Sequence, residues 1–109
     1  MGILSALLFK KTEGEQTDIP TLVKNGALVI DARSAEEFSS GHIEGAINMP
    51  HTLTDRLIGK HAKSKKDAIV IYCHSGMRSG HACKVLTQMG YTQVVNGGSL
   101  HHMQKSLSN

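Results

Sequence analysis

The feature that most constrains the fold is an uninterrupted apolar run at 68–72 that leads directly into a cysteine. The run reads AIVIY, and Cys73 and the polar sequence HSGMRS follow it without a break. Such a run is typical of a strand buried on both faces of a parallel sheet. A second run, 27–30, ends in the same way at Asp31. In open α/β sheets, reactive groups gather beyond the carboxyl ends of the strands, which is where Cys73 falls.

Helical segments are predicted between the strands. Pro20 near the start and Gly26 past the end delimit a short first helix. Ser34 and Glu37 have the spacing of a capping box, which predicts a helix that ends at Gly41. The later segments are a strand at 46–49, a helix near 53–60, a helix with Ala82, Val85, Leu86 and Met89 on its apolar face and Gly90 as its cap, a strand at 93–95, a Gly97–Gly98 turn, and a helix capped by Ser99. This alternation predicts an α/β fold with right-handed crossovers, an open parallel sheet and helices on both faces.

Length and charge limit the choice of partners. The chain of 109 residues fits one domain, and a net charge of +3 mildly favours small anionic substrates. That charge is too weak to predict nucleic-acid binding without a concentrated basic stripe. One basic run is present, and we interpret it as a solvated face rather than a docking patch: Lys60, Lys63, Lys65 and Lys66. Two cysteines are few for a small secreted domain, so we expect a cytoplasmic protein.

The first 17 residues are predicted to be an apolar segment and a polar linker ahead of a domain at 18–109. The apolar run, Ile3 to Phe9, is too short to span a membrane. Its positive charges, Lys10 and Lys11, follow the run, whereas a secretory signal has them before it. We expect a short helix that packs on the domain or on a partner, with weak association with a membrane surface as the alternative.

The loop at 73–79 has the composition of an anion site. A strand, a tight loop and a helix start bring backbone N–H groups and the positive end of the helix dipole together, and these favour a thiolate at Cys73. Gly76 permits the backbone angles of a tight turn. Ser75 and Ser79 can donate hydrogen bonds to the sulfur, and the planar fork of Arg78 matches an oxyanion. These parts predict a nucleophile that attacks an anionic donor and then holds negative charge.

Further motifs lie on both sides of this loop, between residue 18 and residue 100. Together with the loop from Tyr72-Cys73 to Arg78-Ser79, they are Val29-Ile30-Asp31-Ala32-Arg33, Glu37-Phe38, Gly41-His42-Ile43, Gly45-Ala46, Asn48, Pro50, Gly90-Tyr91 and Gly97-Gly98. In these motifs and their spacing the sequence resembles the rhodanese family. The resemblance implies an open parallel sheet of four to five strands with helices on both faces.

The same resemblance implies a thiosulfate sulfurtransferase. Cys73 would attack the outer sulfur of thiosulfate or a similar donor, sulfite would leave with the help of Arg78, and a thiol or cyanide would accept the sulfur. The persulfide on Cys73 would rest among loop residues that bind the substrate: His74, Ser75, Gly76, Met77 and Ser79. The acceptor would be a small-molecule thiol or a sulfur-accepting protein. The resemblance implies no metal and no organic cofactor.

The sequence departs from the family pattern in two places. The family often has a tryptophan a few positions after the double glycine, and His102 and Met103 stand in that region here. The usual first edge strand has no apolar counterpart between Thr12 and Asp18. The number of strands, four or five, therefore depends on that first segment.

Several other polar residues have both a structural and a functional interpretation. We interpret Asp31, Arg33 and His42 as structural, because a charge at a buried strand end needs a partner. Cys83 is expected to be a core thiol, with a resolving thiol for Cys73 as the alternative. His74 is expected to be an exposed neighbour of the loop, as is His81. The seven histidines do not have the ligand spacing of a zinc site, so no metal site is predicted.

Two other functions are compatible with this fold. Some phosphatases and arsenate reductases use a cysteine and an arginine in a similar cradle, but phosphate-cleaving relatives have one more residue between the two. A noncatalytic binding module is the other alternative. The presence of both Cys73 and Arg78 argues against it, because inactive versions of the fold lack the nucleophile.

Overall fold

A computed structural model describes residues 18–108. The predicted N-terminal helix and linker lie outside the described residues. So does the segment from Thr12 to Thr17, on which the presence of a fifth, first edge strand depends. The described elements are α3 (Ile19–Lys24), β1 (Leu28–Asp31), α4 (Ala35–Ser39), β2 (Ile47–Asn48), η1 (His51–Leu53), α5 (Thr54–Leu57), η2 (Ile58–Lys60), β3 (Ala68–Cys73), α6 (Met77–Gln88), β4 (Gln93–Ser99) and α7 (Leu100–Leu107).

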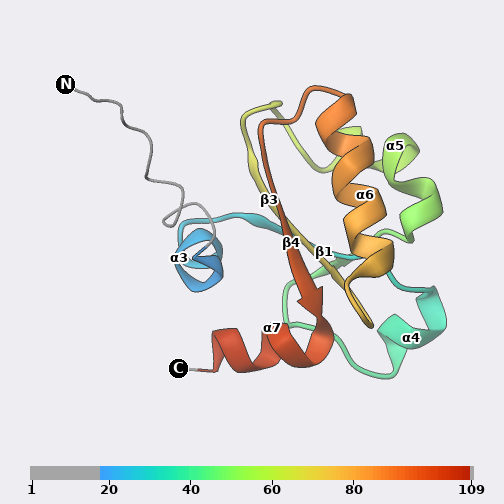
Figure 1. Ribbon diagram of the computed structural model, residues 1–109, viewed down its shortest axis with the longest axis vertical. Helices are drawn as coiled ribbons and strands as arrows, with labels where there is room; N and C mark the ends of the chain where they lie inside the picture. Colours follow the sequence, from blue (N-terminus) through green and yellow to red (C-terminus); the bar gives the residue numbers. More distant parts are fainter. Residues whose placement is uncertain (1–17, 109) are drawn as a thin grey trace.

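The sheet has four strands in the order β2-β1-β3-β4, and every pair is parallel (Figure 1). The two central strands, β1 and β3, are the two apolar runs of the sequence. Each is buried almost throughout, which explains why their sequences do not alternate between apolar and polar residues. The predicted α/β class and parallel sheet are confirmed.

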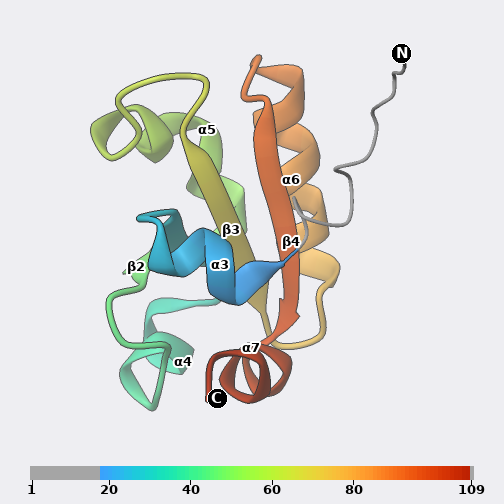
Figure 2. The ribbon, with the colours of Figure 1, turned by 90° about the vertical axis from the view of Figure 1, so that its left-hand side faces the viewer.

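Helices cover both faces of the sheet, as Figures 1 and 2 show, with α3 and α7 on one face and α5 and α6 on the other. Successive side chains of β3 point to opposite faces. Ile69, Ile71 and Cys73 belong to the apolar cluster beneath α5 and α6. Val70 and Tyr72 belong to the cluster beneath α3 and α7. Cys73 therefore lies at the end of a central strand, on the α6 side.

The predicted Gly97–Gly98 turn is wrong, because β4 continues through both glycines to Ser99. Asn96 pairs with Ile71 while Gly98 pairs with Tyr72, so Gly97 is an extra residue in the ladder, as in a β-bulge. A Cβ atom on Gly97 would lie 2.6 Å from the Met103 sulfur, and Gly98 has a φ of +81°. The glycines serve close packing and a bulge rather than a chain reversal.

Three other boundaries differ from those predicted. The helix expected near 53–60 is one α-helical turn, α5, between two 3₁₀ segments, η1 and η2. The strand expected at 46–49 is limited to Ile47–Asn48. The helix after Cys73 begins at Met77, inside the predicted loop, because Gly76 at a φ of +94° turns the chain into it. The loop between Cys73 and this helix is therefore limited to residues 74–76, which is shorter than the sequence indicated.

Candidate active site

The candidate nucleophile lies where β3 passes into α6. Cys73 ends the strand, residues 74–76 form a bend, and the first turn of α6 begins at Met77. The side chain of Cys73 is fully buried. In Figure 1 this junction is at the lower end of the sheet, on the same side as the start of α7. The carboxyl ends of parallel strands meet there, as the sequence predicted.

Hydrogen-bond donors surround the sulfur of Cys73. The N–H of Gly76 donates to Sγ at 3.0 Å, and the Ser79 hydroxyl oxygen lies 3.4 Å from it. Burial raises the pKa of the Cys73 thiol, but the hydroxyl of Ser79 and the backbone N–H groups of Ser79, Gly76 and Ser75 together outweigh burial and hold that pKa below its usual value. The site can therefore hold a thiolate or another anion centred on sulfur.

Arg78 is bound to a carboxylate rather than pointing at an open anion site. Its Nη1 donates to Glu37 Oε1 at 2.8 Å and its Nη2 to Glu37 Oε2 at 3.0 Å. Oε1 of Glu37 also accepts from the N–H and hydroxyl of Ser34 in the predicted capping box, which is present. The hydrogen bond from Arg78, more than any other cause, lowers the pKa of Glu37 to about 2. Glu37 is therefore ionised at neutral pH, and it links α4 to the first turn of α6.

Asn96 of β4 is a site residue that the sequence analysis missed. Its Nδ2 donates to the Gly76 carbonyl at 3.0 Å, and its Oδ1 accepts from the Ser79 hydroxyl at 2.7 Å. Asn96 is exposed and stands in a strand with weak patterning. No sequence signal distinguishes such a residue from an ordinary surface polar residue.

Asp31 and Arg33 form a buried ion pair with each other. Nε and Nη2 of Arg33 lie 3.0 and 2.7 Å from the Asp31 carboxylate, and the Arg33 N–H also donates to it at 2.9 Å. Arg33 additionally donates to the carbonyl of Gly41. His42 stacks on Phe38 with ring centroids 3.6 Å apart, and its Nδ1 lies 2.7 Å from the Phe38 carbonyl oxygen. These contacts support the structural interpretation of all three residues.

The other candidates lie around the loop. His74 and Ser75 are exposed, Met77 is 80% exposed, and His81 forms an edge-on contact with His51. Cys83 is half-buried against the core beneath α6, where burial first and the Cys73 charge second raise its thiol pKa to about 11. Both cysteines are free thiols. Within residues 18–108, no cluster of three or more metal-ligating side chains is present.

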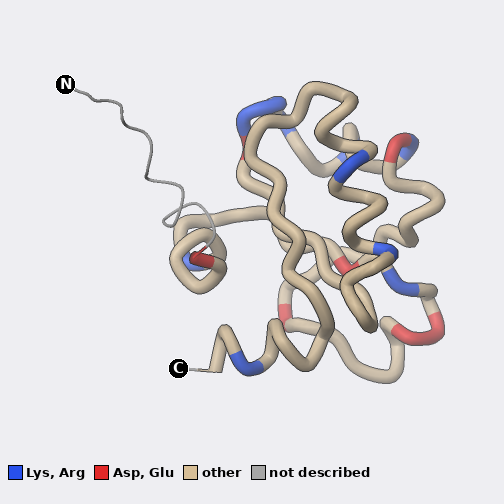
Figure 3. Tube along the Cα trace, viewed as in Figure 1, with Lys and Arg blue, Asp and Glu red and all other residues tan. Residues whose placement is uncertain are grey.

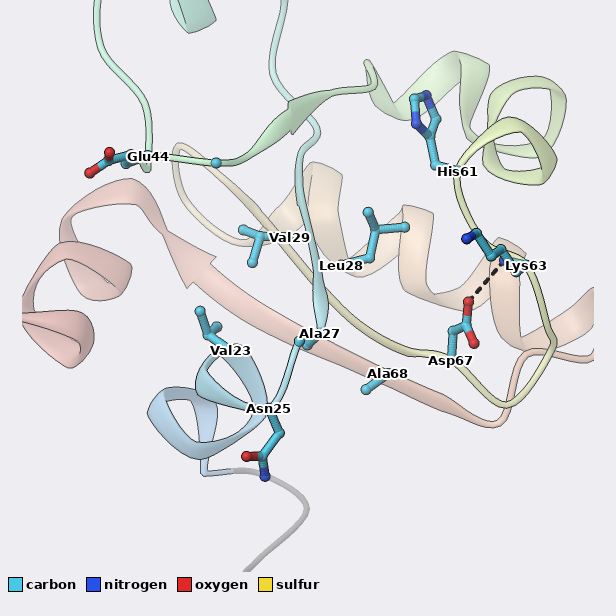
Figure 4. A pocket seen from close by; sticks show the side chains of 12 residues that line it. Val23, Asn25, Ala27, Leu28, Val29, Glu44, His61, Lys63, Asp67 and Ala68 are labelled. Atoms are coloured by element: carbon cyan, nitrogen blue, oxygen red, sulfur yellow. Dashed lines mark hydrogen bonds between the residues drawn. The ribbon is translucent and has the colours of Figure 1, made fainter.

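The basic side chains and a cavity are the other surface features of the described residues. Lysines and arginines are scattered over the described helices and loops rather than gathered in one stripe (Figure 3). A cavity of about 560 Å³ lies at the amino ends of β1 and β3, beside Leu28 and Ala68 (Figure 4). It is at the opposite end of the strands from Cys73, and it contains none of the predicted site residues. In the described part of the chain, no helix is long and apolar enough to cross a membrane.

A buried cysteine that ends a central parallel strand, with N–H donors from a short loop and a helix start, is an arrangement that can support cysteine-based group transfer on an α/β fold. The sequence model of the rhodanese-like domain matches residues 15–99. The chain therefore belongs to the rhodanese-like sulfurtransferase family.

Relatives in sequence and structure agree with this assignment. Thiosulfate sulfurtransferase PspE of Escherichia coli strain K12 is 39% identical over 71 residues, which cover 65% of this chain and 68% of PspE. A sulfurtransferase of Allochromatium vinosum is 38% identical over 69 residues, which cover 63% of each chain. A solved rhodanese with anions from E. coli has a TM-score of 0.69 and 36% identity, covering 71% of this chain and 91% of its own.

Proposed function

We propose that the protein transfers sulfur from thiosulfate or a similar donor to a thiol or cyanide through a persulfide on Cys73. The observation that carries the proposal is the Cys73 sulfur at the start of α6, with the Gly76 N–H 3.0 Å away and a lowered thiol pKa. The similarity to PspE, which is named a thiosulfate sulfurtransferase, supports the choice of donor.

The reaction has two displacement steps at sulfur. The Cys73 thiolate attacks the outer sulfur of thiosulfate, a bond forms between the two sulfurs, and the bond to the central sulfur breaks. Sulfite leaves with that electron pair. A second thiolate, or cyanide, then attacks the outer sulfur of the persulfide and releases the Cys73 thiolate. The cycle returns the enzyme to its initial state and needs neither an external oxidant nor a reductant.

The loop residues have distinct proposed roles. Gly76 donates to the charged sulfur, and Ser75, Ser79, His74 and Met77 surround the persulfide. Arg78 uses two N–H groups on Glu37, and a guanidinium has five, so the remaining ones are available for the leaving sulfite. The ion pair with Glu37 fixes the plane of that guanidinium, which makes its approach to sulfite directional.

The donor has to reach a sulfur that is fully buried in this structure. We propose that the donor approaches over the exposed residues of the loop and of the start of α6: His74, Ser75 and Met77. A thiol acceptor, on a small molecule or on a sulfur-accepting protein, would approach over the same residues. Cytoplasmic location stays a prediction from the low cysteine content.

Intact-mass spectrometry after incubation with thiosulfate tests the proposal. The wild-type protein should gain the mass of one sulfur atom, lose it on adding cyanide, and produce thiocyanate catalytically. Cys73→Ser should abolish both the mass gain and the production of thiocyanate, because the attacking thiolate is lost. Cys83→Ser, the matched control, should keep most of the activity. Equal loss in both variants would replace the single-thiol mechanism with one that needs two thiols.

A further inference from the structure

Asn96 connects three parts of the loop region through one side chain. Oδ1 accepts from the Ser79 hydroxyl at 2.7 Å and from the Gly98 N–H at 3.0 Å, while Nδ2 donates to the Gly76 carbonyl at 3.0 Å. The Gly98 N–H can only donate and the Gly76 carbonyl can only accept, so the orientation of the amide is fixed by its partners. Asn96 is thus held in one orientation beside the nucleophile.

The hydroxyl of Ser79 has one proton and two candidate acceptors. Asn96 Oδ1 is at 2.7 Å and Cys73 Sγ is at 3.4 Å. When the proton points to Asn96, the sulfur faces the lone pairs of the Ser79 oxygen and receives no hydrogen bond from it. When the proton points to the sulfur, it stabilises the thiolate or the terminal charge of a persulfide. The acceptor strength of Asn96 therefore affects the charge on Cys73.

We propose that Asn96 is a positioning residue for Cys73, because it competes with the sulfur for the Ser79 hydroxyl proton and holds the Gly76 carbonyl. The inference rests on the proposed function only in taking Cys73 as the nucleophile. Asn96 does not touch the sulfur itself in the described contacts. It acts on Cys73 through Ser79 and through Gly76, whose N–H donates to Sγ at 3.0 Å.

The packing of α6 makes room for this side chain. A Cβ atom on Gly80 would lie 3.3 Å from Asn96 Nδ2, which is tighter than ordinary contact. Gly80 also donates its N–H to the Gly76 carbonyl at 3.0 Å, the same oxygen that Asn96 Nδ2 binds. A residue without a side chain in the first turns of α6 therefore lets β4 reach the loop. This close approach is independent of the hydroxyl geometry, and it points to the same bridging role.

The ionisable groups around the loop are kept unchanged in the test, except that Cys83 is replaced throughout. Arg78 and Cys83 interact electrostatically with the Cys73 sulfur. The ionisable side chains on the surrounding elements are Arg78, His81, Cys83 and Lys84 on α6, His74 in the loop, Glu36 and Glu37 on α4, His51 on η1, the Asp31–Arg33 pair at the end of β1, Tyr72 on β3, and His101, His102 and Lys105 on α7.

A double-mutant cycle separates this role from general loop support. In a Cys83→Ser background, Ser79→Ala is made with Asn96 intact and again with Asn96→Ala. The pH midpoint of thiolate formation at Cys73 is measured by ultraviolet absorbance and by alkylation rate. In the Asn96→Ala protein the Ser79 hydroxyl has lost its competing acceptor and donates fully to the sulfur. We therefore expect Ser79→Ala to raise the midpoint by about 0.5 to 1 pH unit more in the Asn96→Ala background than with Asn96 intact. Equal shifts in the two backgrounds would overturn the proposal.

A second substitution keeps the test valid if Asn96→Ala unfolds. Asn96→Asp places a stronger acceptor opposite Ser79, so it should raise the pH midpoint of Cys73. The rise should be smaller in a Ser79→Ala protein, because no hydroxyl proton is then left to compete for. The same rise with and without the hydroxyl would leave only charge repulsion and refute the positioning role. Gln93→Ala, on an exposed residue of the same strand, should shift nothing. Persulfide formation is scored separately by mass, so its absence in the parent protein would overturn the proposed function and not this inference.

Discussion

Burial and hydrogen bonding act on the Cys73 thiol in opposite directions. A cysteine packed against an apolar cluster would ordinarily be an inert thiol with a raised pKa, as the half-buried Cys83 is. At Cys73 the N–H groups of the loop and the Ser79 hydroxyl reverse that effect, and the pKa falls below its usual value. The end of β3 and the helix α6 that follows it thus carry two different cysteine environments, and only that of Cys73 suits a nucleophile.

Alkylation kinetics should report both the lowered pKa and the burial of Cys73. In a Cys83→Ser protein, the rate should rise with pH as the thiol ionises, with a midpoint below about 8.5, the value of a free thiol. Because the sulfur is fully buried, a small reagent such as iodoacetamide should react much faster than a bulky maleimide, relative to their rates with free cysteine. A midpoint at or above the free value would contradict the loop's role, and equal relative rates would contradict the burial.

Glu37 links α4 to the first turn of α6, next to the loop that follows Cys73. Its carboxylate completes the capping box of α4 and binds both terminal nitrogens of Arg78. The two side chains are about one-third exposed, so the ion pair itself contributes a modest amount to stability. Its larger effect is geometric, since it holds the guanidinium of Arg78, in the first turn of α6, beside the loop.

Glu37→Gln should lower the free energy of unfolding by about 0.5 to 1 kcal/mol at neutral pH. The carboxylate has a pKa of about 2 in the folded protein and an ordinary value of 4.5, so its contribution is fully present above 4.5 and is lost as the pH falls toward 2. Chemical denaturation at several pH values would show the difference between the two proteins shrinking below 4.5. Glu36→Gln, in the same helical turn, is the control for the helix dipole. A difference that persists at pH 2 would exclude the ion pair as its cause.

The close packing around Gly97, in the bulge of β4, predicts that a larger residue there destabilises the fold. Adding a Cβ atom there brings it within 2.6 Å of the Met103 sulfur and 3.1 Å of a Val70 methyl group, both on buried residues. Gly97→Ala should therefore lower the free energy of unfolding by about 1 to 3 kcal/mol, the usual cost of overpacking. Gly59→Ala is the matched control, because a Cβ atom there meets nothing within 4 Å. Similar thermal midpoints for the two variants would show that the Met103 side chain moves aside to make room for the added methyl group.

The parts of the fold that the sequence predicted are those with a local cause. The apolar runs of β1 and β3 are continuous because both faces are covered, and the Ser34–Glu37 capping box depends on residues three apart. The loop motif around Cys73 is also contiguous in the chain. Such features can be read before folding is known because each depends on neighbours in the sequence.

The missed features depend on residues that are distant in the chain. Glu37 and Arg78 are 41 positions apart and Ser79 and Asn96 are 17 apart, so no local pattern joins them. The sequence predicts a turn at the double glycine because glycine has the same sequence signature in turns and in bulges. The pairing of Asn96 and Gly98 with consecutive residues of β3 distinguishes the two, and it is not visible in the sequence.

On the scale of the whole molecule, the sheet separates two apolar clusters and brings the functional contacts to one edge. The cluster beneath α5 and α6 includes Cys73, and the cluster beneath α3 and α7 includes Met103, which packs behind Gly97. The cavity at the other end of the strands has no part in the proposed chemistry. In addition, β4 and α4 each contribute one polar side chain, Asn96 and Glu37, that contacts the loop region.

The length of the loop predicts sulfur transfer rather than phosphate hydrolysis. From Cys73 to Arg78 the segment spans six residues, with four between the ends, which is one fewer than in phosphate-cleaving relatives of this fold. The loop N–H groups determine the width of the anion site. The outer sulfur of a persulfide is a single atom, whereas a phosphoryl group presents several oxygens that each need a donor. The shorter loop should therefore fit sulfur and exclude phosphate.

A further feature of the site acts in the same direction. The loop has no aspartate or glutamate to protonate a leaving alcohol. The unmodified protein should produce thiocyanate from thiosulfate and cyanide, and its hydrolysis of an aryl phosphate should be negligible. Inserting a glycine after Gly76 should weaken sulfur transfer, because the widened ring moves the N–H donors away from the sulfur. Phosphatase turnover that depends on Cys73, with no persulfide detectable by mass, would reverse the assignment.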